Sequence, residues 1–304
     1  MLGIILTLTL QAAAPSPAPP SPPAQEPRGQ LTLDEGEPSP TPDQALLAAI
    51  RTGTLADVEA ALKRGATLNP PGAVNTPLMV AATRGRVDVA RLLVEKGASV
   101  EAVDTLGRTP LWAAVYGAQP ATWELLLARG ARADSVSKQG DALLDYAIER
   151  VQPAAVAALL KHGADVNRPS RNKLFSGQTP IMRALRLGQR DVVEALLAAG
   201  ADPLTRDVDG VDALRFALRG GNAELVELML KKGCGLRQRD TRQRTLLHLA
   251  AADGSRAMVE LLLAKGLEAK AWDSDGKTPA DLAVGRESEA IRALLGAPPA
   301  PAGK

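Results

Sequence analysis

The stretch of sequence that decides the fold covers residues 76–98 and reads TPLMVAATRGRVDVARLLVEKGA. Thr76 can cap a helix through its hydroxyl group, and Pro77 suits the first helical position because its missing N–H would be unpaired there. Gly97 can adopt the left-handed conformation that ends a helix after a Leu-rich stretch. The stretch therefore predicts two short helices, the first rich in alanine and the second carrying a stripe of Val and Leu.

The same features recur along the chain at nearly constant spacing. A Leu-rich helix end followed by Gly and a small residue occurs seven times, with spacings of 32, 33, 33, 37, 33 and 33 residues. The glycines are Gly65, Gly97, Gly130, Gly163, Gly200, Gly233 and Gly266. A second landmark, Thr-Pro-Leu or a close variant, precedes most of them by 21 residues. Such a period is typical of a repeat architecture, in which each unit buries its face against its neighbours.

These residues resemble the ankyrin repeat. The pattern Gly-x-Thr-Pro-Leu-x-x-Ala-Ala, followed by Val-x-x-Leu-Leu-x-x-Gly-Ala-Asp, is similar to the consensus of that family. The resemblance covers residues 43–296 and implies an all-α ankyrin-repeat solenoid of stacked helix-turn-helix units with short hairpin tips. We expect about eight units including both caps, with a first unit over 43–66 and a truncated last unit over 277–295.

The departures from the pattern are local. Ala142 and Asp212 stand where the fourth and sixth units should have the capping threonine, so we expect degraded but folded repeats. The spacing of 37 reflects four extra residues and predicts a longer hairpin tip over 168–177. This tip contains Leu174 and Phe175, and an exposed pair of this kind is unusual. The pair either contacts a partner or folds back onto the neighbouring repeat.

The composition excludes several classes of protein. The 304 residues include three Trp, two Tyr and two Phe, so the core must be built from Ala, Leu and Val. We expect Trp112 and Trp123 to pack inside the third unit. The single cysteine, Cys234, excludes a disulfide framework and a cysteine-rich zinc site. The chain has no run of eighteen apolar residues and therefore no ordinary membrane span.

Few residues are candidates for chemistry. By the family resemblance, His248 is a structural hydrogen-bonding residue, and His162 at a helix C-terminus is expected at the surface. Cys234 follows a repeat glycine and is expected to be a small packed side chain. The sequence contains no nucleophile elbow, phosphate loop or dinucleotide fingerprint. We therefore predict a protein that is not an enzyme and has no catalytic residue, metal site, cofactor or small-molecule substrate.

Both ends of the chain differ in composition from the repeats. Residues 1–14 are predicted to be a signal peptide, because an apolar run precedes small residues, although a basic n-region is missing. Residues 15–42 hold ten prolines and are predicted to be a disordered linker, and residues 297–304 a flexible tail. We expect a periplasmic or secreted bacterial protein with no stable membrane span after cleavage. A cytoplasmic location is the alternative.

The charge is distributed unevenly. The chain carries +2 in total, because residues 1–42 carry −3 and residues 43–304 carry +5. The resemblance implies that hairpin tips and first helices line a concave groove that binds proteins, and those positions hold fourteen bases and five acids. We single out as partner-binding residues Arg108, Tyr116, Lys138, Arg150, Arg171, Phe175, Arg186, Arg206, Arg219, Arg239, Arg242 and Trp272. The alternative is a general richness in arginine, which supplies 25 of the 36 bases.

Three functions are compatible with this pattern. The first is a scaffold that binds an acidic protein partner through the groove. The second, suggested by resemblance to bacterial ankyrin proteins linked to catalases, is a companion that stabilises one exported enzyme. The third is a polyanion-binding module, which a strong inverse dependence of binding on salt would favour. We do not expect nucleic acid as a partner, because the repeats lack interleaved aromatic residues for base stacking, and we expect a monomer.

Overall fold

The structure, a computed structural model, describes residues 39–296. Apart from two isolated β-bridges, its regular structure in this range is helical, which confirms the predicted all-α class. The α-helices are α1 (Pro42–Thr52), α2 (Leu55–Lys63), α3 (Pro77–Arg84), α4 (Val87–Glu95), α5 (Pro110–Tyr116), α6 (Pro120–Ala128), α7 (Leu143–Glu149), α8 (Pro153–Lys161), α9 (Pro180–Arg186), α10 (Arg190–Ala198), α11 (Ala213–Arg219), α12 (Ala223–Lys231), α13 (Leu246–Ala252), α14 (Arg256–Ala264) and α15 (Ser288–Leu294). Two 3₁₀ turns, η1 (Lys173–Phe175) and η2 (Pro279–Leu282), accompany them. The predicted signal peptide 1–14, linker residues 15–38 and the tail 297–304 lie outside the described residues.

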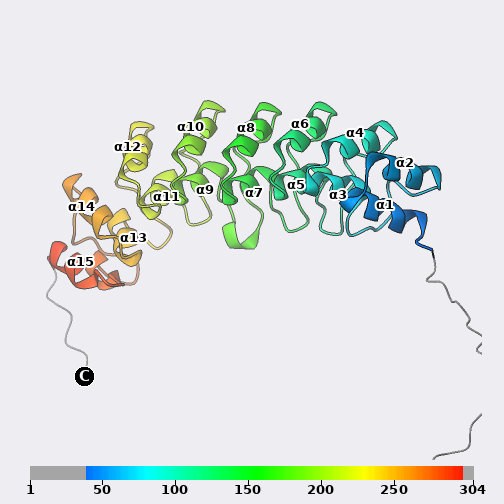
Figure 1. Cartoon of the computed structure of the whole chain (residues 1–304). Helices are drawn as coiled ribbons and strands as arrows, with labels where there is room; N and C mark the ends of the chain where they lie inside the picture. Colours follow the sequence, from blue (N-terminus) through cyan, green and yellow to red (C-terminus); the bar gives the residue numbers. More distant parts are fainter. Residues whose placement is uncertain (1–38, 297–304) are drawn as a thin grey trace, which may run out of the picture. The chain divides into compact units, whose positions relative to one another are not determined.

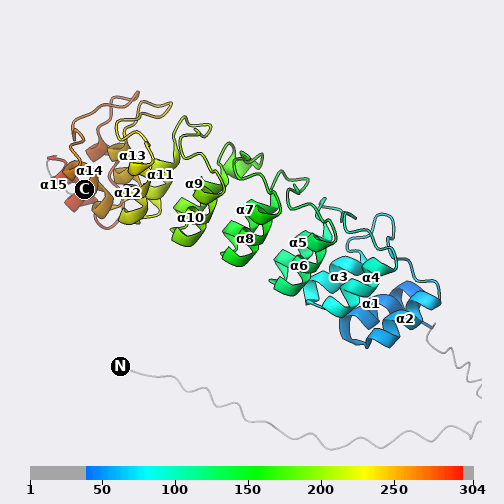
Figure 2. The same ribbon diagram turned by 90° about the horizontal axis from the view of Figure 1, so that it is seen from above.

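The helices form successive units of two. Unit 1 consists of α1 and α2, unit 2 of α3 and α4, and so on to unit 7 with α13 and α14, while unit 8 combines η2 with α15. The first helices of neighbouring units contact one another, as α3 contacts α5 and α7 contacts α9. The second helices form a parallel row, and the loops between units project on the side of the first helices (Figures 1 and 2). We call the surface formed by the first helices and these loops the groove face.

The local features that define a unit lie where the sequence predicts them. Thr76 Oγ1 accepts the N–H of Met79 at 3.3 Å, and Pro77 is the first residue of α3. The seven glycines that follow the second helices have φ between 81° and 99°. Because a side chain disfavours this left-handed conformation, glycine ends each second helix and turns the chain into the next loop.

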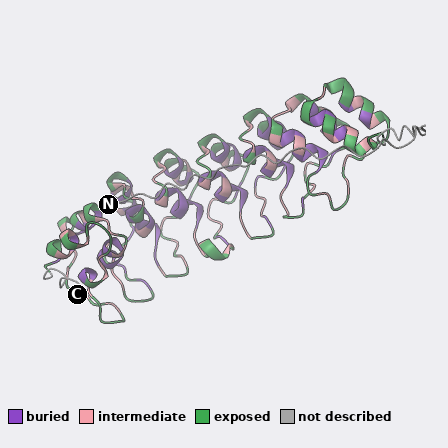
Figure 3. Cartoon of the chain, turned by 60° about the horizontal axis from the view of Figure 1, so that its bottom comes forward, coloured by how far each residue is buried: buried purple, intermediate pink, exposed green. Residues whose placement is uncertain are grey.

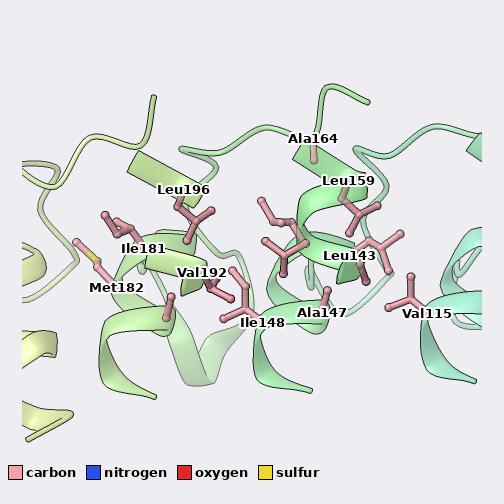
Figure 4. Packing of buried hydrophobic residues seen from close by; sticks show 14 of the residues in the cluster. Val115, Leu143, Ala147, Ile148, Leu159, Ala164, Ile181, Met182, Val192 and Leu196 are labelled. Atoms are coloured by element: carbon pink, nitrogen blue, oxygen red, sulfur yellow. The ribbon is translucent and has the colours of Figure 1, made fainter. Parts of the chain in front are cut away.

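Small side chains allow neighbouring units to approach closely. The buried alanines of the first helices include Ala81, Ala114, Ala147, Ala184, Ala217 and Ala250. A Cβ atom placed on Gly220 would lie 2.2 Å from the carbonyl oxygen of Leu185 in the preceding unit. Between the alanines, aliphatic side chains and methionine fill the core (Figure 4). The fold thus needs few aromatic rings, and Trp112 and Trp123 are buried as expected.

The two units without a capping threonine are folded, as expected. In unit 4, α7 begins after Ala142 without a side-chain cap. In unit 6, Asp212 replaces the threonine, and its Oδ1 accepts the N–H of Leu214 at 3.0 Å. The same oxygen accepts Nε2 of Gln238 at 2.7 Å, which ties unit 6 to the loop that leads into unit 7.

Candidate functional site

Aromatic residues gather at one place on the groove face. Of the seven in the chain, Trp112 and Tyr116 on α5 and Tyr146 on α7 border a single pocket of about 380 Å³. We call it the aromatic pocket. It is lined by Arg51, Asn75, Met79, Val80, Thr83, Arg84, Asp104, Arg108, Thr109, Trp112, Ala113, Tyr116 and Tyr146. First helices of units 1 to 4 and the loop of unit 3 therefore contribute to it.

The three rings differ in exposure. Trp112 is buried and packs against Tyr146, with ring centroids 5.2 Å apart and planes inclined by 45°. Tyr116 is 56% exposed, although nothing in the packing of the repeat requires a large ring there. The guanidinium of Arg150 lies 6.0 Å from the centre of the Tyr146 ring, within the range of a cation–π contact. Burial raises the pKa of the Tyr146 hydroxyl, which keeps it a neutral donor.

Most charged residues at the aromatic pocket are arginines, and most of these have no carboxylate partner among the described residues. Arg51 and Arg84 are exposed and form no ion pair within residues 39–296. Arg108 is paired with Asp104, whose Oδ2 accepts its Nε at 2.8 Å. The other oxygen of Asp104 accepts the backbone N–H groups of Leu106 and Arg108, each at 2.8 Å. Asp104, the acid that lines the pocket, is therefore fully engaged within the protein. Of the three arginines that line the pocket, Arg51 and Arg84 have no carboxylate partner among the described residues.

Two polar atoms of pocket-lining residues lack partners. Trp112 Nε1 and Thr109 Oγ1 are buried and have no hydrogen-bond partner among the described residues. A buried donor without an acceptor costs roughly 1–3 kcal/mol, so such groups are rare in folded proteins. Both belong to unit 3, Thr109 at the N-terminus of α5 and Trp112 within it.

A second group of charged residues lies one unit further along. It consists of Asp145 and Glu149 on α7 and Arg183 and Arg186 on α9, and we call it the buried charge cluster. Arg183 and Asp145 are both buried, with Nε and Oδ1 3.5 Å apart. Glu149 Oε1 contacts Nη1 of Arg183 at 3.4 Å and also pairs with Arg186. Two bases and two acids thus neutralise each other across the interface between units 4 and 5.

The electrostatics of the cluster centre on Asp145. Burial raises the pKa of Asp145 to about 7, against the opposing attraction of Arg183, because neither carboxylate oxygen has a hydrogen-bond donor among the described residues. Asp145 is the third residue of α7, the place that His248 has in α13. A buried carboxyl group near its titration point makes this interface sensitive to pH.

The longer tip covers the buried charge cluster. Phe175 is half-buried, and the guanidinium groups of Arg183 and Arg186 lie 4.2 Å and 5.5 Å from its ring centre. Ser170 Oγ accepts Nη2 of Arg183 at 2.8 Å. Phe175 therefore folds back onto the neighbouring repeat, whereas Leu174 is 82% exposed; Figure 3 shows the tip as an exposed turn below α7 and α9. Of the two alternatives for the pair, Phe175 thus follows the second and packs on the neighbouring repeat.

The bases in the later units are mostly engaged within the protein. Arg206 donates to the carbonyl of Gly210, and Arg239 donates to the carbonyls of Gln243 and Trp272. The other predicted partner-binding residues divide as follows: Lys138 donates to the carbonyl of Thr105 at 3.0 Å, Arg219 lies 4.0 Å from Asp253, and Arg171, Arg242 and Trp272 are exposed. The structure thus brings Arg108, Tyr116 and Arg150 together and distributes the rest along the groove face.

The sequence interpretation missed two residues of the aromatic pocket, Tyr146 and Arg51, and comparison of equivalent positions could have found the first. Tyr146 occupies the position of Val80, Ala113 and Arg183 in its unit, directly after the position of His248. That position faces the groove, so an alignment of the units would have shown Tyr146 as a groove residue. Arg51 belongs to the cap unit, which lacks the Thr-Pro-Leu landmark, and the sequence contains no comparable signal for it.

The residues considered for chemistry have structural roles. His248 Nδ1 accepts the N–H of Thr245 at 3.1 Å and Nε2 lies 3.0 Å from the carbonyl of Lys277, as expected for a structural histidine whose pKa burial lowers. Cys234 is buried, as expected, and burial raises its pKa to about 12. Within residues 39–296, no three His, Cys, Asp or Glu side chains are grouped to hold a metal ion. No helix in this range is long and apolar enough to cross a membrane.

The fold and the groove face define a helical repeat protein of the ankyrin type. The family model of ankyrin repeats (3 copies) matches residues 46–135, 98–170, 124–207 and 214–300, and the chain belongs to the ankyrin repeat family. The crystal structure of the human ASB11 ankyrin repeat domain is similar, with a TM-score of 0.62 and 27% sequence identity over 74% of this chain and 100% of that chain. Among curated proteins, none matches the chain. Ankyrin repeats are in general protein–protein interaction modules.

Proposed function

We propose that this chain is a non-enzymatic scaffold that binds an acidic protein surface through the aromatic pocket of units 1 to 4. The observation that carries the proposal is the pocket itself, where Tyr116 is exposed without a packing role and Arg51 and Arg84 have no ion pair among the described residues. Aromatic residues and arginine are the preferred anchors of protein interfaces. The proposal concerns this part of the groove rather than its whole length, because the later bases are engaged internally.

Crosslinking at Tyr116 tests the proposal. A photoreactive amino acid would replace Tyr116 in one variant and Glu124, which is exposed on the second helix α6, in a matched control. After irradiation in cells of the source organism, we expect a protein adduct from position 116 that position 124 does not give. Adducts at position 124 with none at 116 would contradict the proposal.

The same experiment separates the two alternative functions. A polyanion-binding module would give an adduct whose captured component resists protease and whose yield falls steeply as salt rises, because counterion release dominates such binding. If the chain is a companion of one exported enzyme, the adduct would contain that enzyme alone. The melting temperature of the enzyme would then rise when the chain is added. A scaffold gives a protein adduct without this increase.

We also propose that the chain is exported to the periplasm or secreted, on the basis of the apolar run and small residues in positions 1–14. Expression of the full chain followed by mass measurement of the periplasmic and medium fractions tests it. We expect a product that lacks the leader outside the cytoplasm. An intact product confined to the cytoplasm would support the alternative location.

A further inference from the structure

The aromatic pocket combines aromatic and aliphatic walls with polar residues and basic flanks. Its walls include Met79 and Val80 of α3 and the rings of Trp112, Tyr116 and Tyr146. A volume of about 380 Å³ lies within the range of pockets that enclose a small ligand or a large side chain. The chain has concentrated large side chains here although alanine and aliphatic residues suffice for its core. The interior therefore suits an apolar side chain supplied by a partner.

The basic residues lie on both sides of the rings along the row of units. Arg51 on α1 and Arg84 on α3 precede the rings, and Arg150 follows them at the end of α7. None of the three forms an ion pair within residues 39–296. Asp104, the acid of the pocket, already accepts from Arg108 and two backbone groups. A bound segment would thus meet positive charge on both sides of its apolar side chain and no uncompensated negative charge.

The spacing of the units sets the length of such a segment. Packed helices lie about 8–10 Å apart, so Arg84 in unit 2 and Arg150 in unit 4 are separated by two steps, or roughly 16–20 Å. An extended peptide advances about 3.3 Å per residue, so about five or six residues bridge this distance. The acidic residues of the segment should therefore flank the apolar residue at two or three positions on either side.

We infer that the aromatic pocket recognises an extended peptide segment of a partner protein in which one large apolar side chain is flanked on both sides by carboxylates. This inference rests on the proposed function and specifies the chemistry of the partner. The apolar side chain enters between Tyr116 and Tyr146, and the carboxylates meet Arg84 on one side and Arg150 on the other.

Fluorescence anisotropy with a labelled synthetic peptide, Glu-Glu-Ser-Leu-Ser-Glu-Glu, tests the inference on the full chain. We expect binding that weakens roughly tenfold or more when Gln replaces every Glu, and similarly when Ser replaces the Leu. Equal binding of the Gln peptide, equal binding of the Ser peptide, or no binding of the original peptide would overturn the inference.

Variants of the protein provide the matched controls. Arg84→Gln and Arg150→Gln should each weaken peptide binding, Arg84→Lys should restore part of it, and Arg91→Gln, which removes an exposed base from the second helix α4, should leave it unchanged. Circular dichroism confirms that each variant is folded. If the Arg84 and Arg150 variants bind as the original protein does, the inference fails. A protein adduct at Tyr116 would even then support the proposed function, so the two failures are distinguishable.

Discussion

The aromatic pocket of units 1 to 4 and the buried charge cluster of units 4 and 5 are made from the same kinds of residue, yet they differ in what their arginines contact. In the pocket, Arg51 and Arg84 reach solvent beside an exposed ring. In the cluster, Arg183 is buried against Asp145 and covered by Phe175. Arginine at a groove position is therefore available to a partner only where neither a carboxylate nor a backbone carbonyl of the protein engages it. This difference decides where binding is expected and where stability is expected to depend on charge.

The largest expected effect is the loss of the buried pair. Arg183→Met should lower the free energy of unfolding by about 3 kcal/mol at neutral pH, because it removes the cation that faces Asp145 and Glu149 and leaves Ser170 Oγ without its donor. Chemical denaturation measures the change. Arg242→Met, which removes an exposed base, should stay within about 0.5 kcal/mol of the original protein. Equal losses of unfolding free energy in the two variants would show that Arg183 contributes no more to stability than an exposed, unpaired arginine does.

The pH dependence of stability should follow Asp145. Its pKa in the folded protein is raised from 3.8 to about 7, so the folded state holds a proton that the unfolded chain releases. The resulting stability is fully present below pH 3.8 and is lost as the pH rises through about 7, with a slope of at most about 1.4 kcal/mol per pH unit. Asp145→Asn should remove this slope. Denaturation curves across this range would contradict the assignment if the slope persisted in the variant.

An intermediate effect is expected on binding at the aromatic pocket. Tyr116→Ala should weaken binding of the crosslinked partner by about 2 kcal/mol without a measurable change in stability, because the ring is exposed. Trp272→Ala is the matched control, since it removes an exposed ring from a later loop. Calorimetric titration measures both. A greater loss for the Trp272 variant would move the binding site to the C-terminal end of the groove face.

The smallest effect concerns the tip over the buried charge cluster. Phe175→Ala should cost about 1 kcal/mol, since it removes one ring from two guanidinium groups, and should speed tryptic cleavage after Arg171 or Lys173. Leu174→Ala is the control, because its exposed side chain should contribute little to stability. Equal cleavage rates in the two variants would show that Phe175 does not hold the tip in place.

The fold could be predicted from the sequence because its determinants are local and repeated. The glycines after the second helices and the threonine and proline at the start of α3 each act within a few residues of the helix ends that they set. The roles of His248 and Cys234 follow from their positions within a unit for the same reason. The longer tip was predictable from the spacing, although the contact of Phe175 with Arg183 was not.

The sequence could not predict in this way which charged groove residues are paired within the protein and which are free to meet a partner. Glu149 lies 34 residues before Arg183 and 37 before Arg186, so their pairing depends on how units 4 and 5 stack and on which side-chain rotamers meet. Likewise, Arg239 is engaged by the carbonyl of Trp272, 33 residues away. A count of bases on the groove face therefore overstates the charge that a partner can use.

Charge reversal in the two parts of the groove face tests most directly the claim that units 1 to 4 bind the partner. The photoreactive residue at position 116 would be combined either with Arg51→Glu and Arg84→Glu or with Arg206→Glu and Arg239→Glu. We predict that the first pair nearly abolishes the crosslinked adduct, whereas the second pair leaves most of it, because Arg206 and Arg239 are engaged by backbone carbonyls. An adduct that survives the first pair and disappears with the second would contradict the claim.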